Sequence, residues 1–157
     1  MDFIHPMRRL RLPFIVIAVL MVLFVVARLA ITPLSPRPAN LGVTDGALAP
    51  CPSTPNCYAS SVNNRPIPYS GTQADAHDRL VAIIENMPRT KVITDQPGYI
   101  HAEFRSALWG FIDDVEFYFD PQDSVIHYRS AARLGHGDMG VNRARIEDIT
   151  AQFNNNS

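Results

Sequence analysis

The stretch FIDDVEFYFDPQDSVIHYRSA, residues 111–131, contains two runs in which apolar and polar residues alternate. Such alternation predicts β-strands, and the residues DPQDS at 120–124 predict the turn between them. Two further strand-like runs precede this stretch, KVIT from Lys91 and GYIHAEFRSAL from Gly98. Because the connections between the four runs are short, the sequence predicts a four-stranded antiparallel meander.

The side chains of this predicted sheet separate into an apolar face and a charged face. If Leu108 lies opposite Phe111, and Phe117 lies opposite Ile126, the apolar residues of the last three strands share one face. The opposite face then carries three cross-strand rows, which are Arg105, Asp114 and Arg129; Glu103, Glu116 and His127; and His101 with Tyr118. We expect the first row to be a structural charge pairing.

Two helices are expected to cover the apolar face. The first begins near Thr72, whose side chain can cap it, carries an apolar stripe, and ends before Pro88. The second runs from about Asn142 to Phe153. The predicted fold is therefore α+β, an antiparallel four-stranded meander with two helices packed on one face.

The N-terminal residues 1–12 are basic, and residues 13–31 form an apolar run with Arg28 as its one charge. A basic flank before such a run predicts that the flank stays in the cytoplasm and the run enters the membrane. We therefore predict a single transmembrane anchor, or uncleaved signal, in the inner (plasma) membrane, with a cytoplasmic N-terminus and a periplasmic or otherwise extracytoplasmic C-terminal domain. A cleaved signal peptide, cut beside the small residues at 25–27, and a buried core helix are the alternatives.

The segment that follows is expected to hold the folded part away from the membrane. Residues 32–50 are rich in proline and small residues, which predicts a semi-rigid linker, while the exported domain spans about 40–153 and residues 154–157 form a polar tail. The two cysteines, Cys51 and Cys57, predict a disulfide in an oxidising exported compartment, with two free thiols as the alternative. Zinc binding would need two more ligands, and none stands beside them.

The charge of the chain is balanced, with 14 Lys+Arg against 15 Asp+Glu, which argues against nucleic acid as a partner. The row of Glu103, Glu116 and His127 supplies candidate catalytic residues, because carboxylates beside a histidine can hold a divalent metal or divide acid and base roles. A solvated sheet face is the alternative. No serine, Ser60 included, lies in a recognisable nucleophile motif. We predict no cofactor and no resident metal.

The stretch RSAARLGHGDMGVNR, residues 129–143, leads from a strand through a glycine loop into a helix. Its GHGDMG segment matches a dinucleotide-binding pattern, but the further strand that such a fold needs does not follow before Ser157. Glycine backbone, a helix N-terminus and arginines instead predict an anion site formed by Arg129, Ser130, Arg133, Gly135, Gly137, Asn142 and Arg143. In the alternative, Asp138 or Asn142 caps the helix, and Arg133 or Arg143 pairs with Asp113 or Asp114.

A resemblance to a known family rests on three stretches: NLGVTDGALAPCPSTPNCYASS (40–61), DDVEF (113–117) and RSAARLGHGDMGVNRARI (129–146). They resemble the opening, central and closing signatures of the domain-of-unknown-function family 1499 (DUF1499). Tyr58, Ala59 and Ala132 depart from the pattern, which commonly has Val-Ser and a second serine there. The resemblance implies a bacterial, membrane-anchored member and its domain boundaries, and it implies no catalytic residues.

These observations together predict a binding or interaction module of the cell envelope. Its partner would be an anionic small molecule, a lipid headgroup or an envelope protein, held by the arginines around the glycine loop. A metal-dependent or acid/base hydrolase at the carboxylate and histidine row is the first alternative, and a structural partner of another membrane protein is the second. An acyl-transfer enzyme is a weak candidate because no nucleophile motif is recognisable, and a binding module is the leading interpretation.

Overall fold

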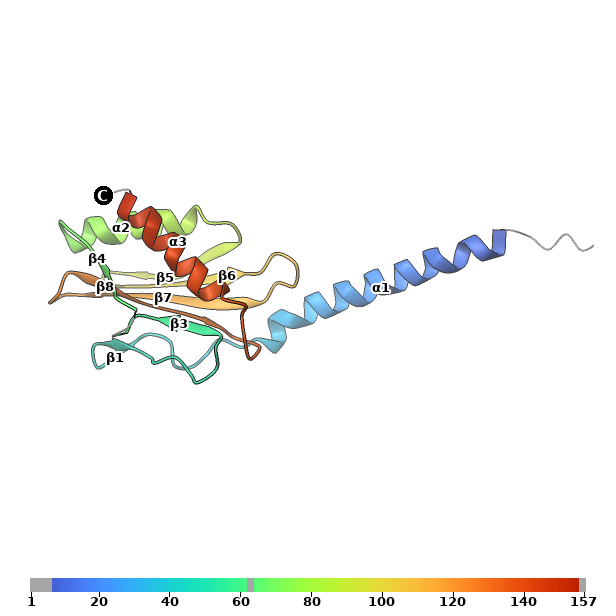
Figure 1. Cartoon of the computed structure of the whole chain (residues 1–157), viewed down its shortest axis with the longest axis horizontal. Coiled ribbons are helices and arrows are strands. Elements are labelled where there is room, and N and C mark those ends of the chain that lie inside the picture. Colours follow the sequence, from blue (N-terminus) through green and yellow to red (C-terminus); the bar gives the residue numbers. More distant parts are fainter. Residues whose placement is uncertain (1–6, 62–63, 156–157) are drawn as a thin grey trace, which may run out of the picture.

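Within a larger antiparallel sheet, the four predicted strands pair in sequence order as a meander (Figure 1). In the computed structural model, which describes residues 7–61 and 64–155, its strands are β5 (Thr90–Gln96), β6 (Tyr99–Arg105), β7 (Ile112–Asp120) and β8 (Val125–Ala132). The other elements are α1 (Met7–Leu34), β1 (Val43–Thr44), β2 (Ala47–Leu48), β3 (Cys57–Ala59), β4 (Ile67–Pro68), α2 (Gln73–Glu85) and α3 (Val141–Asn155). Of the predicted terminal segments, residues 1–6 and 156–157 lie outside the described residues.

The sheet has six strands, so the predicted number of four is wrong. Strands β3 and β4 both pair antiparallel with β8 and extend the sheet along its outer edge. They contain three and two residues, which is too short for an alternating pattern to show in the sequence. Their pairing gives hydrogen-bond partners to backbone groups of β8 that an open edge would leave unpaired.

The predicted strand registers are wrong by two residues. Phe117 lies opposite Tyr128 rather than Ile126, and the tight turn expected before Phe111 is instead a loop of residues 106–111. Ser106 closes this loop, because its side chain accepts a hydrogen bond from the N–H of Phe111 at 3.0 Å. A shift of two residues preserves the alternation of side chains, so the predicted apolar and charged faces are correct.

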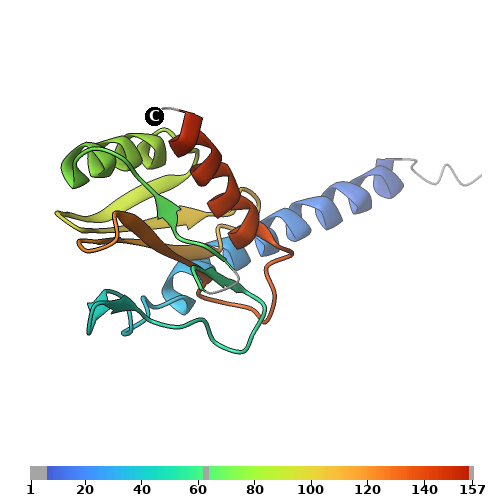
Figure 2. The same cartoon turned by 60° about the vertical axis from the view of Figure 1, so that its left-hand side comes forward.

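Helices α2 and α3 cover the apolar face of the sheet, as Figures 1 and 2 show. Thr72 caps α2 by accepting a hydrogen bond from the N–H of Asp75 at 3.1 Å. The core between the helices and the sheet includes the fully buried side chains of Leu80, Phe117 and Ile149. Burial of each such side chain stabilises the fold by about 1.5–3 kcal/mol.

Helix α1 contains the apolar segment expected to meet the membrane. Leu12–Leu34 is long and apolar enough to cross a bilayer, and its most apolar part is 0% buried within the protein. An apolar helix with this exposure does not behave as a core helix, because core helices bury their apolar side chains against other elements. The segment therefore fits a membrane anchor or a signal sequence.

The segment predicted as a spacer instead packs on the sheet. Residues 35–56, which we call the strap, run back across the charged face of the sheet on the side opposite α2 and α3 (Figure 1). Within the strap, β1 and β2 form a short hairpin, and β2 contacts β7 and β8. The charged face is therefore buried rather than solvated, with Glu116 0% and Asp114 1% exposed.

Helix α3 begins directly after the glycine loop and is capped by Asp138. The carboxylate accepts hydrogen bonds from the N–H groups of Gly140 at 3.0 Å and Asn142 at 2.7 Å. This confirms the alternative interpretation of the glycine loop in which Asp138 caps the last helix. The helix N-terminus is thus occupied by a carboxylate of the chain itself.

Asp138→Ala should lower the free energy of unfolding by about 1 kcal/mol, because the first backbone N–H groups of α3 lose their acceptor. Urea unfolding of the full chain in detergent, followed by circular dichroism, measures the change. Asp148→Ala, at an exposed position of the same helix, is the matched control and should change the free energy by less than about 0.5 kcal/mol. Equal losses in the two variants would contradict the cap.

Candidate functional site

An ion-pair network lies between the strap and the charged face of the sheet. Glu103 on β6 lies opposite Asp114 on β7, so two carboxylates face each other. Arg133, which follows β8, bridges them: its Nη2 lies 2.6 Å from Glu103 Oε1 and 2.7 Å from Asp114 Oδ1. Its Nε also donates to Asp114 Oδ2 at 2.8 Å. The arginine supplies the positive charge that two opposed carboxylates require.

The strap adds groups of its own to this network. Arg37 donates to Glu103 at 2.9 Å, and the main-chain N–H of Gly42 donates to Glu116 at 2.7 Å. The carbonyl of Ser35 accepts a hydrogen bond from Arg133 at 3.3 Å. Gly42 has a φ of +104°, a left-handed conformation that glycine adopts without steric cost. Charge-assisted hydrogen bonds therefore fix the strap to the sheet.

Glu116 is fully buried and has partners for its charge. It accepts a hydrogen bond from the Tyr99 hydroxyl at 2.8 Å and pairs with Arg129 at 3.0 Å, besides the contact with the strap. His101 Nε2 lies 2.8 Å from Asp114 Oδ1 in the same layer. Burying an unpaired carboxylate would be strongly destabilising, and these partners offset that cost.

The network lowers the pKa of two of its carboxyls. Burial by itself raises the pKa of Asp114, but hydrogen bonds from Arg133 and His101 outweigh burial and hold the pKa below its ordinary value. Hydrogen bonds from Arg37 and Arg133 lower the pKa of Glu103 against burial in the same way. Both side chains are therefore ionised at neutral pH. Burial, followed by the charge of Glu116, raises the pKa of Tyr99, so its hydroxyl keeps the proton that it donates.

The three predicted catalytic residues do not share one row. Glu103 and Glu116 lie in adjacent rows with different partners, and His127 lies opposite Tyr118, one row further along. The predicted row is wrong because it followed from the registers that are shifted by two residues. Among residues 7–61 and 64–155, no three His, Cys, Asp or Glu side chains are grouped so that they could hold a metal ion.

The predicted anion-binding residues lie in separate places. Arg129 and Arg133 are on the strap side of the sheet, where they pair with carboxylates. Ser130 and Asn142 are buried on the helix side and share a hydrogen bond of 2.6 Å. Arg143 is exposed on α3 and pairs with an acidic side chain one turn along. Arg129 and Ser130 are adjacent in a strand, so their side chains point to opposite faces.

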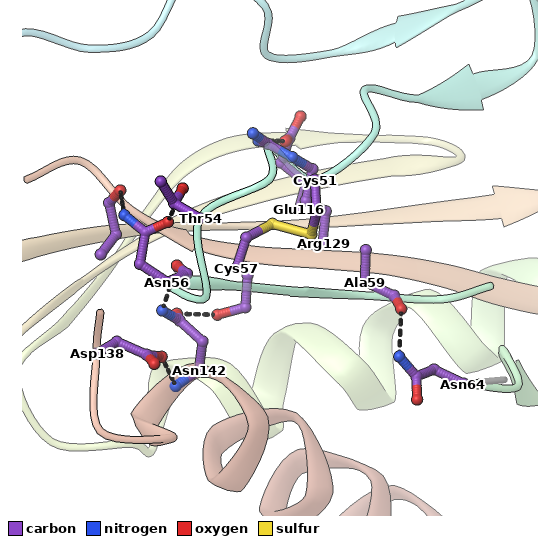
Figure 3. Close-up of a disulfide and its surroundings, with 12 residues drawn as sticks. Cys51, Thr54, Asn56, Cys57, Ala59, Asn64, Glu116, Arg129, Asp138 and Asn142 are labelled. Atoms are coloured by element: carbon purple, nitrogen blue, oxygen red, sulfur yellow. Dashed lines mark hydrogen bonds and ion pairs between the residues drawn. A yellow bond between two sulfur atoms is a disulfide. The ribbon is translucent and has the colours of Figure 1, made fainter. Parts of the chain in front are cut away.

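The glycine loop is joined to the disulfide loop through Asn56 (Figure 3). Asn56 Nδ2 donates to the carbonyl of Gly135 at 2.7 Å, and the carbonyl of Asn56 accepts from Asn142 Nδ2 at 3.0 Å. Gly135 has a φ of +93°, which explains the glycine at this turn, and Gly137 lies beside Pro55 of the strap. Two loops far apart in the sequence are thereby held together at the start of α3.

Cys51 and Cys57 form the predicted disulfide, with an S–S distance of 2.07 Å. The disulfide borders a pocket of about 500 Å³ between the strap and the outer edge of the sheet, which we call the strap pocket. Strap residues 46–51 form one wall, and residues 57–61 with Asn64, His127 and Tyr128 form the other. The volume lies in the range of small-molecule sites in proteins.

The pairing of Ser60 with His127 in the strap pocket was not predicted from the sequence. Ser60 Oγ lies 3.0 Å from His127 Nδ1, and it accepts a hydrogen bond from the N–H of Tyr128 at 3.3 Å. On the other side of the ring, His127 Nε2 lies 3.9 Å from Asp120 Oδ2. The pairing of β3 with β8 brings Ser60 to His127, and β3 is too short to be recognised in the sequence.

Comparison with known families gives one result for this chain. The family described as Protein of unknown function (DUF1499) matches residues 47–153. The chain belongs to this family. Comparisons with curated proteins and with solved structures find no match. The DUF1499 match begins at β2 in the strap and ends in α3, so it covers the six-stranded sheet and all residues that line the strap pocket except Gly46.

The three stretches that resemble DUF1499 signatures meet in space. Residues 40–61 form most of the strap and β3, residues 113–117 lie in β7, and residues 129–146 form the second half of β8, the glycine loop and the start of α3. The hydrogen bond from Gly42 to Glu116 joins the first stretch to the second. The contact between Asn56 and Asn142 joins the first to the third. The DUF1499 signatures therefore converge on the strap.

Asp114→Asn should lower the free energy of unfolding by about 3 kcal/mol at neutral pH, because Arg133 loses a buried charge partner. The pKa of Asp114 is lowered in the folded state, so its stabilising contribution is present above the ordinary carboxyl pKa of about 3.9 and is lost as the pH falls through the folded value. The difference between variant and wild type should therefore narrow on acidification. Urea unfolding at a series of pH values measures it.

Asp123→Asn, in the exposed turn between β7 and β8, is the control for this experiment and should leave stability unchanged at every pH. The assignment of Asp114 to a stabilising ion pair is contradicted by a variant that is as stable as the wild type at neutral pH. The assignment is also contradicted if the difference in free energy of unfolding between Asp114→Asn and the wild type stays constant as the pH is lowered.

Proposed function

We propose that the chain is a membrane-anchored binding module of the cell envelope and that its ligand occupies the strap pocket. The observation that carries the proposal is the pocket itself, a cavity of about 500 Å³ with apolar strap residues on one side and hydrogen-bonding side chains on the other. Concave sites with mainly apolar walls and a few convergent polar groups are typical of small-molecule binding.

The lining of the strap pocket favours a small amphiphile as the ligand. Ala47, Leu48 and Pro50 offer an apolar wall, whereas Ser60 and His127 offer a hydroxyl and an imidazole across from it. None of the described residues that line the pocket is Lys, Arg, Asp or Glu. Because one proton is shared between Ser60 and His127, a polar or anionic head group would accept a hydrogen bond from one of the two, and the apolar part of the molecule would lie along the strap.

This site differs from the anion site predicted at the arginines around the glycine loop. Arg129 and Arg133 are enclosed and already pair with Glu116 and Asp114. An anion bound there would have to displace a carboxylate from a buried pair, and breaking such a pair costs about 3–5 kcal/mol. Binding in the strap pocket requires no such exchange, so the geometry supports the pocket better than the arginines.

The contact of α1 with the folded domain supports an anchor that is kept rather than cleaved. The ring of Phe24 packs against Trp109 with 5.1 Å between the centroids. Cleavage beside residues 25–27 would remove this contact. The basic residues that precede the apolar run favour a cytoplasmic N-terminus, which places the domain outside the cytoplasm. The disulfide agrees with an oxidising compartment.

A small molecule should remain in the strap pocket when the full chain is purified from its own membrane. Native mass spectrometry of the wild type should show an adduct, and Ala49→Trp should abolish it because the indole fills the pocket. Ala74→Trp, at an exposed position of α2, is the matched control and should keep the adduct. Lipids retained by α1 are common to the wild type and both variants. An adduct that is lost only in Ala49→Trp therefore lies in the strap pocket.

Two results would contradict ligand binding in the strap pocket. One is a wild-type protein that carries no adduct, which would favour the role of structural partner of another membrane protein. The other is an adduct that survives in Ala49→Trp as well as in Ala74→Trp, which would place the bound molecule elsewhere on the chain.

The contact between Ser60 and His127 favours ester hydrolysis as a second candidate function. His127 Nδ1 is placed 3.0 Å from Ser60 Oγ, where it can accept the hydroxyl proton and so activate a nucleophile. However, the N–H groups of Ser60 and Ser61 donate to backbone carbonyls and are not directed at the pocket, as an oxyanion hole requires. Glu103 and Glu116 lie beneath the strap and do not line the pocket. Binding is therefore the leading proposal.

We expect a fluorophosphonate probe to leave Ser60 unlabelled under conditions that fully label a known serine hydrolase, because the N–H groups of Ser60 and Ser61 donate to backbone carbonyls and do not stabilise an oxyanion. Mass spectrometry of the digested full chain locates any modified serine, and Ser60→Ala provides the blank. Labelling of Ser60 that disappears in His127→Ala would overturn this expectation and make the hydrolase the better assignment.

A further inference from the structure

The loop between β6 and β7, residues 106–111, carries an exposed apolar tip. Leu108 is 61% exposed, Trp109 is 40% exposed and Phe111 is 41% exposed. Single exposed apolar residues are common on protein surfaces, but several that are contiguous indicate an interaction surface. The strap pocket and the ion-pair network do not involve these three side chains.

The tip is fixed by hydrogen bonds within the loop. The N–H of Ser106 donates to the carbonyl of Phe111 at 2.9 Å, and the N–H of Gly110 donates to the carbonyl of Ser106 at 3.1 Å. Gly110 has a φ of +76°, in the region where glycine replaces other residues at tight turns. A loop that is already ordered loses little conformational entropy when its side chains bind a partner.

The tip lies against the apolar helix α1. Arg28, the one charged residue of Leu12–Leu34, donates to the carbonyl of Leu108 at 3.0 Å. A Cβ atom at position 110 would lie 2.7 Å from Arg28 Nη1, so Gly110 permits this approach. Figure 1 shows the loop at the end of the sheet from which α1 leaves. The apolar tip is thus continuous with the apolar surface of the helix.

The position of the contact along α1 decides what surrounds the tip. Phe24, which packs against Trp109, lies four residues before Arg28, which corresponds to about 6 Å of helix. In a helix that spans the bilayer, a charged side chain near the outer end extends to the headgroups, so Trp109 lies about one helical turn below the level of Arg28. This depth corresponds to the boundary between headgroups and acyl chains, where tryptophan and other aromatic side chains are enriched.

We propose that the β6–β7 tip is a membrane-docking surface, in which Leu108, Trp109 and Phe111 insert into the outer leaflet beside α1. The proposal rests on the membrane anchor of the proposed function and is independent of the strap pocket. Lipid is the fitting occupant because the surface of α1 next to the tip is itself uncovered by protein. The tip gives the domain a second attachment, which fixes its orientation on the bilayer.

Trp109 is the single tryptophan of the chain, so its fluorescence reports on the tip alone. The full chain is reconstituted in phosphatidylcholine vesicles with brominated acyl chains in both leaflets, and association is checked by flotation. Bromine near the headgroup end of the chain should lower Trp109 emission roughly twofold, and more than bromine near the chain end does. In the control Trp109→Phe/Gln122→Trp, whose tryptophan lies in the exposed β7–β8 turn, emission should not change.

The possible outcomes separate this proposal from the proposed function. A chain that fails to float with the vesicles overturns both the anchor and the docking of the tip. A chain that floats, but whose Trp109 is quenched by aqueous iodide and not by bromine, overturns the docking surface and leaves the anchor and pocket standing. Shielding of Trp109 from both quenchers also overturns it, because protein rather than lipid then covers the tip.

Discussion

The contact of Arg133 with Asp114 and Glu103 is the interaction on which one side of this fold depends. Two carboxylates opposed on neighbouring strands repel each other unless a cation lies between them. Because Arg133 neutralises the two carboxylates, they can be buried beneath the strap. From the strap, Arg37 donates to Glu103, and the carbonyl of Ser35 accepts a hydrogen bond from Arg133. The strap in turn supplies one wall of the strap pocket. The pocket therefore exists because the charged face is covered.

The elements with strong periodicity were predictable from the sequence, and the contacts between distant segments were not. Strands β6 to β8 and helices α2 and α3 alternate or repeat their apolar residues over seven or more positions, so the pattern indicates both the type of each element and the face that it buries. Registers depend on the loops, and the loop closed by Ser106 has no signature in the sequence. The predicted apolar and charged faces are correct although the registers are wrong, because a register shift of two residues leaves each side chain on the same face of the sheet.

The candidate site illustrates the same limit at the level of single residues. Arg129 and Ser130 were grouped because they are neighbours in the sequence, yet a strand points them to opposite faces. Ser60 and His127 are far apart in the sequence and meet through β3, which has only three residues. Residues 32–50, which include most of the strap, are predicted as a linker because they are rich in proline and small residues, and this composition does not reveal that Gly42 and Arg37 contact buried carboxylates. In each case the position of the side chain depends on contacts between segments that are distant in the sequence or on the direction of a strand, and local composition does not reveal either.

Helix α1 ends at Leu34, and the next residue, Ser35, already accepts a hydrogen bond from Arg133. No slack length of chain separates the apolar helix from the buried ion pairs. A helix that spans a bilayer adjusts its tilt to the thickness of that bilayer. The helix is joined directly to the strap, and the contact of Arg28 with Leu108 holds it against the β6–β7 loop. A change in the tilt of α1 would therefore displace the strap and, with it, one wall of the strap pocket.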